Sequence, residues 1–118
     1  MYSFETKIKS LLIESTTVSA VIDAINKKQM VKINYMGDNN APSGERTIEP
    51  YLIGKTTAGN LAIRAFETEG YTKTFVPDWK IFILDKISTW EVLQQNFEIR
   101  ANYNQYGDKS FSQITAKI

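Results

Sequence analysis

Three positively charged side chains, Arg46, Arg64 and Lys80, are the residues of this sequence best suited to binding an anion. Each lies in a different apolar segment that is typical of a β-strand. Neighbouring strands are about 4.8 Å apart, so cations at facing positions can converge on one anionic group. Arginine also carries a planar fork that matches phosphate and carboxylate. The pattern predicts an anion site on a sheet, and an ordinary solvated sheet face is the alternative.

Aromatic side chains in the same segments extend this prediction to nucleotides. Tyr35, Tyr51 and Phe82 lie close in sequence to the expected strands. Aromatic rings hold single bases by stacking without strict sequence readout. Trp79 and Trp90 are expected to be core packing residues instead.

Carboxylates offer a second kind of chemistry. Glu49 and Asp85 lie within apolar runs, where two close carboxylates with one raised pKa can act as acid and base. Ion pairs with Arg46 or Lys86 are the simpler interpretation. Three other aspartates stand beside glycine, asparagine, proline or lysine and fit turns or caps: Asp38, Asp78 and Asp108.

The composition excludes most catalytic and metal-binding templates. The 118 residues contain no cysteine and no histidine, so thiolate chemistry, disulfides and zinc knuckles are ruled out. We therefore expect a protein that is not an enzyme and that uses no cofactor or metal. The net charge of +1 gives no bulk attraction for a long polyanion. With no long apolar run and no signal-peptide profile, we expect a single domain, residues 1–118, in the cytoplasm.

Periodicity predicts the elements that must position the cations. Helical spacing covers residues 4–14 and 18–25, and Thr17 fits the N-cap of the second helix, giving N-terminal helices within residues 1–28. A period of two predicts a β-core within residues 30–97. Its expected strands are residues 30–36, 46–55, 60–67, 79–82 and 84–93, the last two as separate strands or one bent strand.

The connections and the C-terminal region complete this prediction. Residues 37–45 and 70–78 are expected to be long loops, and Pro50 predicts a bend, a bulge or an edge position in its strand. In the extension, residues 98–118, Asp108 fits the cap of a short helix whose Phe111 and Ile114 touch the core. The fold class expected is α+β, mainly β, with a small curled sheet.

The middle of the chain resembles the WYL domain. A basic residue leads into Ile-x-Pro, followed by Leu-x-Ile-Arg-Ala-Phe, Gly-Tyr-Thr-Lys and Pro-Asp-Trp-Lys-Ile-Phe-Ile-Leu-Asp-Lys-Ile. The family commonly ends in Arg-x-Phe-Arg-Leu-Asp-Arg-Ile, so lysine replaces arginine at position 80 and isoleucine stands at position 83. Leu61-Ala62-Ile63 occupies the place of the Trp-Tyr-Leu triplet. The resemblance covers roughly residues 22–97.

This resemblance implies a strongly bent Sm-like or SH3-like β-barrel preceded by a helix. It implies a ligand-sensing module of bacterial regulators and defence proteins, with Tyr35, Arg46, Arg64 and Lys80 as ligand-binding residues. The expected partner is a nucleotide or a short, single-stranded nucleic acid. Because no winged helix is seen, the chain looks similar to small proteins of bacteriophages or mobile elements.

A protein-interaction adaptor is the alternative function. It would dock on a host or viral protein through a sheet edge or through the aromatic loop at residues 70–78. Ligand identity, assembly into a homo-oligomer, and a role in transcription or in phage–host conflict are left open by the sequence.

Overall fold

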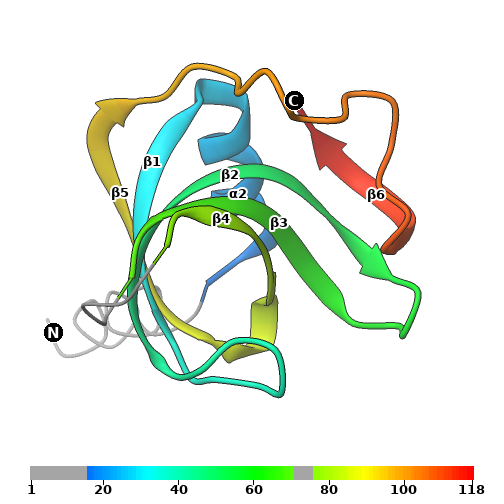
Figure 1. The fold of residues 1–118 in the computed structure, drawn as a ribbon, viewed down its shortest axis with the longest axis horizontal. Coiled ribbons are helices and arrows are strands. Elements are labelled where there is room, and N and C mark those ends of the chain that lie inside the picture. Colours follow the sequence, from blue (N-terminus) through cyan, green and yellow to red (C-terminus); the bar gives the residue numbers. More distant parts are fainter. Residues whose placement is uncertain (1–15, 71–75) are drawn as a thin grey trace, which may run out of the picture.

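A computed structural model describes residues 16–70 and 76–118 of the chain. Within them, one α-helix precedes six antiparallel strands, so the predicted α+β, mainly β class is confirmed. The predicted helix at residues 4–14 and the core of the 70–78 loop lie outside the described residues. Figure 1 shows the strands curving around an interior that α2 covers from behind.

Helix α2 (Val18–Lys27) forms where its N-cap and apolar spacing predict it. The Thr17 hydroxyl accepts a hydrogen bond from the Ala20 amide at 3.1 Å, which satisfies one of the first amides of the helix. Lys28 ends the helix in the left-handed conformation at φ 51°. The face with Val21, Ala24 and Ile25 is buried against β1, β2 and β6, so α2 closes one side of the core.

Five strands form one continuous antiparallel sheet in the order β4-β3-β2-β1-β5. They are β1 (Gln29–Tyr35), β2 (Gly44–Thr56), β3 (Leu61–Glu69), β4 (Asp78–Ile83) and β5 (Ile87–Asn96). A single 3-10 turn, η1 (Leu84–Lys86), joins β4 to β5. The expected strands are confirmed, with β4 and β5 as two separate strands.

The long strand β2 organises this sheet. It pairs with β3 along one edge, from Thr47 to Lys55, and with β1 along the other edge, from Gly44 to Ile48. The register shifts between Pro50 and Leu52, which is the irregularity that the proline predicted. After this bend, β2 no longer pairs with β1, so the rest of that edge of β2 is open to another strand.

That strand is β6 (Phe111–Lys117), which pairs with β2 from Leu52 to Thr56. The predicted C-terminal helix is therefore wrong. Phe111 and Ile114 are separated by one helical turn in sequence, but Phe111 is buried and Ile114 is 40% exposed. Asp108 therefore lies before a strand and caps no helix. Figure 1 shows this strand, β6, at the red end of the chain.

The sheet curls but does not close into a barrel within the described residues. The end strands of the path, β4 and β5, are joined by η1 and do not pair with each other. The interior of the curl is filled by a core to which α2, all of the first five strands and the loop residue Ala41 contribute. The curl leaves β4 with one edge unpaired in the described part of the chain, and this edge positions the candidate site.

Candidate functional site

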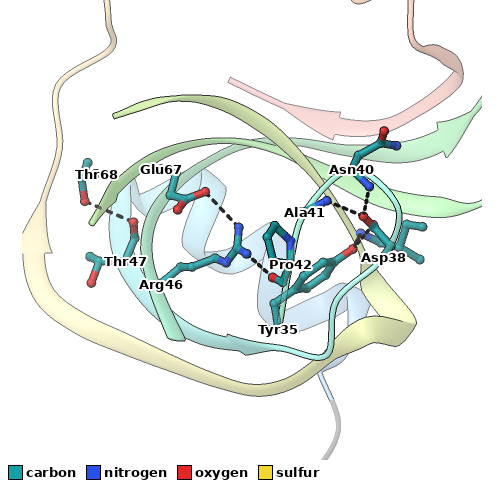
Figure 2. Close-up of polar contacts among 10 residues, drawn as sticks. Tyr35, Asp38, Asn40, Ala41, Pro42, Arg46, Thr47, Glu67 and Thr68 are labelled. Carbon is teal, nitrogen blue, oxygen red and sulfur yellow. Dashed lines mark hydrogen bonds and ion pairs between the residues drawn. The ribbon is translucent and has the colours of Figure 1, made fainter. Parts of the chain in front are cut away.

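Arg46 points into the interior of the curl. Its side chain is 2% exposed, and its guanidinium forms an ion pair with Glu67 at 3.1 Å. It also donates to the Pro42 carbonyl (Figure 2). Its guanidinium carbon lies 5.3 Å from the centre of the Phe82 ring. This cation is thus part of the core in the structure.

Tyr35 lies beside Arg46, with its ring centre 5.6 Å from the guanidinium carbon. Its hydroxyl donates to the Asp38 carboxylate at 2.5 Å and accepts from the Ile83 amide at 3.0 Å. Burial, followed by the bond to Asp38, raises the pKa of Tyr35 above its usual range. The ring is 1% exposed, so its polar end ties the loop after β1 to the end of β4.

Glu67 shares this interior with two cations. Burial raises the pKa of Glu67, while the charges of Arg46 and Lys80 lower it by a smaller amount. Ile63, Ala65 and Glu67 alternate along β3, so the carboxylate occupies an inward position among apolar residues. That alternation was the signal in the sequence that could have identified Glu67.

Arg64 lies on the opposite face of the sheet from Lys80. Lys80 is paired with Ala65 across the two strands, and Arg64 is the neighbour of Ala65. The Arg64 guanidinium binds both carboxylate oxygens of Asp108, at 2.7 and 3.1 Å. Despite its partial burial, this pairing and the bond from the Ser110 amide hold the pKa of Asp108 below its usual value.

The structure therefore does not bring all three cations to one anion. Arg46 and Arg64 are each paired with a carboxylate, and they lie on different sides of the sheet. Ligand binding by Tyr35, Arg46, Arg64 and Lys80 remains a prediction, for which the geometry favours the last two.

Arg64 and Lys80 meet at one cavity of about 410 Å³, which we call the edge cavity. Because β4 has an unpaired edge in the described chain, a cavity there is reached from both faces of the sheet. Polar groups of three other segments complete the wall: Asp38 and Asn40, Thr56, Thr57 and Asn60, and Ser110.

Asp38 is the negative group of the edge cavity, but its oxygens are already engaged. One oxygen accepts from the amides of Asn40 and Ala41, at 2.8 and 2.7 Å, and the other accepts from Tyr35 (Figure 2). These bonds, working against burial, lower the pKa of the Asp38 carboxyl. The turn role predicted for Asp38 is confirmed.

A second cavity of about 260 Å³ adjoins the first, since Arg64 and Trp79 line both. Tyr103 lies across it, with its ring centre 6.0 Å from that of Trp79. The aromatic rings expected to stack on a ligand, Tyr35, Tyr51 and Phe82, are all buried. Trp79 packs against the core rings of Tyr51 and Phe66, as expected, and it also lines both cavities.

One further ion pair joins distant parts of the chain. Glu49 binds the Arg100 guanidinium at 2.8 and 3.1 Å, so its partner is neither Arg46 nor a second catalytic carboxylate. Arg100 also lies 3.7 Å from the centre of the Phe66 ring. The pair fastens the segment after β5 to the outer face of the sheet.

Two other features are absent from residues 16–70 and 76–118. No three acidic side chains gather there as a metal site. No helix in that part of the chain has the length and apolar character that a membrane crossing needs.

No family model matches the chain, and no curated protein matches it.

Proposed function

We propose that the chain is a non-catalytic binding module for a nucleotide or a short single-stranded nucleic acid, which enters the edge cavity. The observation that carries this proposal is that two of the predicted cations, Arg64 and Lys80, line this one cavity. Its volume of about 410 Å³ lies in the range of small-molecule sites.

Lys80 is the residue that we propose to hold the phosphate. Among the described residues it forms no ion pair, whereas the charge of Arg64 is balanced by Asp108. On the inner side, Glu67 is ion-paired with Arg46, and the charge of Lys80 acts on the same carboxylate without forming an ion pair with it. A bound phosphate would neutralise that charge in a partly dehydrated place, where electrostatic attraction is strong.

The first prediction tests this role by thermal unfolding with uridine monophosphate and inorganic phosphate. We expect nucleotide at about ten times its Kd to stabilise the protein by about 1.4 kcal/mol, with an effect that weakens in salt. Lys80→Gln should lose the effect because it removes the positive charge that we propose to hold the phosphate. Lys55→Gln, at an exposed position of β2, is the matched control.

If the ligand stabilised wild type and Lys80→Gln equally, Lys80 would not be the residue that holds the phosphate. No shift with any phosphate compound would overturn the proposed function itself.

The WYL resemblance gives this proposal its biological setting. We place the module among ligand sensors of bacterial regulation or phage–host conflict, with a bent Sm-like or SH3-like fold. What supports this placement is the curled sheet, in which the 13-residue β2 pairs with three other strands.

An adaptor function remains the second candidate because β4 pairs only with β3 in the described part of the chain. An unpaired edge can accept a strand from a partner protein. This candidate would gain from a pull-down that returns one specific protein while no nucleotide changes the melting temperature.

A further inference from the structure

In residues 16–70 and 76–118, the backbone of β4 carries hydrogen-bonding groups that no other strand uses. In a strand, the N–H and C=O of one residue point to the same side, and successive residues alternate. The pairing of β4 with β3 runs without a register shift from Ile83 to Asp78. Alternate residues of β4 therefore direct their main-chain groups away from β3.

Two side-chain oxygens identify which residues these are. The Ile83 amide donates to the Tyr35 hydroxyl at 3.0 Å, and the Trp79 amide donates to the Asp78 carboxylate at 2.7 Å. Ile81 lies midway between these two residues and shares their direction. Its N–H and C=O therefore face the unpaired edge, and Ile81 lines the edge cavity.

This arrangement leaves one residue of the edge available. No side chain of the described residues accepts a hydrogen bond from the Ile81 amide, whereas both neighbouring outward amides are already satisfied. A strand that added here would have to displace the bonds from Asp78 and Tyr35. A compact ligand that needs only one donor and one acceptor displaces neither of them.

We propose that the main chain of Ile81 recognises a nucleobase while Lys80 holds the phosphate. This inference rests on the proposed function and names the part of the ligand that the edge cavity reads. Every base presents an adjacent donor and acceptor on its Watson–Crick edge, and RNA-binding proteins read single-stranded bases there. Uracil offers its N3–H to the Ile81 carbonyl and its O4 to the Ile81 amide. The Ile81 main chain would thus favour any nucleotide, whatever its base, over a sugar phosphate that lacks a base.

The second prediction compares three ligands by calorimetry on the full chain. Uridine monophosphate should bind about tenfold more tightly than ribose 5-phosphate, since the base adds hydrogen bonds to the Ile81 main chain. N3-methyl-uridine monophosphate, whose donor is blocked, should lose most of that gain. Equal binding of the methylated and unmethylated nucleotides would overturn the inference.

A protein variant tests the same contact from the other side. Ile81→Pro removes the amide, and proline is tolerated on an edge strand where that amide faces outward. We expect it to weaken uridine monophosphate binding and to leave ribose 5-phosphate binding unchanged, with Ile81→Val as the control. Where Ile81→Pro does not fold, an ester bond in place of the amide at residue 81 makes the same deletion.

The two proposals fail differently in these experiments. If ribose 5-phosphate binds through Lys80 but the base adds nothing, the phosphate site stands and the role of Ile81 is wrong. If no phosphate compound binds, the proposed function is wrong.

Discussion

Arg46 and Glu67 place a full ion pair inside a small core. Both side chains are 2% exposed, so each ion has lost nearly all of its water. The rings of Tyr35 and Phe82 lie within 5.6 and 5.3 Å of the guanidinium and give it favourable aromatic surfaces. An intact buried ion pair contributes little net stability to the fold. Removing one member is costly, because it leaves the other charge buried without a partner.

The third prediction follows from that asymmetry. Glu67→Gln should lower the free energy of unfolding by about 3–5 kcal/mol, because the Arg46 charge stays buried without its carboxylate. Urea unfolding measures the change. Glu91→Gln, at an exposed position of β5, should stay within about 0.5 kcal/mol of wild type.

A double variant separates charge from packing at this pair. Arg46→Met with Glu67→Leu should recover most of the stability lost in Glu67→Gln, because no ion then remains in the core. A double variant as unstable as the single one would show that the polar contacts, rather than the charges, matter.

For individual residues, the sequence predicted which residue types form the site but only part of their arrangement. Arg64 and Lys80 were identified from alternation within apolar segments, and both line the edge cavity. Asp108 was missed as the partner of Arg64 because 44 residues separate the two. Side-chain pairs across such distances depend on the tertiary fold, which local spacing does not record.

Among the elements, β6 depends most on the rest of the fold. Only Phe111 of its seven residues is buried, so it lacks the alternation that marks a strand in sequence. Its position is set by the open edge of β2 and by two register shifts that fit it there. By contrast, α2 and β1 to β5 carry their own periodicity, and for that reason they were predicted.

Gly54 makes this contact between β2 and β6 possible. A side-chain carbon at residue 54 would lie 2.1 Å from the Gln113 carbonyl oxygen, closer than atoms can approach. The main chains of the two strands therefore meet without a side chain between them.

The fourth prediction is that Gly54→Ala moves β6 away from β2. We expect a loss of about 1–3 kcal/mol in the free energy of unfolding, the usual range for added volume in a packed place. Amide hydrogen exchange should rise in residues 111–117 and change little in β3. Lys55→Ala, on the exposed neighbour, should leave exchange in β6 unchanged, and the same result for Gly54→Ala would contradict the close approach.

In the described part of the molecule, two carboxylates with lowered pKa values make stability fall in acid. Asp38 and Asp108 have lowered pKa values in the fold, so the stability they contribute is lost as the pH falls below their ordinary value of 3.8.

The fifth prediction uses Asp108→Asn to test this loss of stability in acid. The variant should be less stable than wild type at pH 6, where the Arg64 pair is intact, and should lose less stability between pH 4 and pH 2. Chemical unfolding at a series of pH values measures both slopes. Asp85→Asn, on the exposed η1 turn, is the control and should follow wild type throughout. Parallel slopes for Asp108→Asn and wild type would contradict the lowered pKa.

The two side-chain hydrogen bonds on β4 also affect the tendency of the protein to aggregate at high concentration. An uncovered strand of a curled sheet invites copies of the same chain to stack edge to edge into fibrils. The Asp78 and Tyr35 oxygens occupy the amides on which such stacking would depend. Because these two amides are already bonded, we expect the β4 edge to resist such stacking.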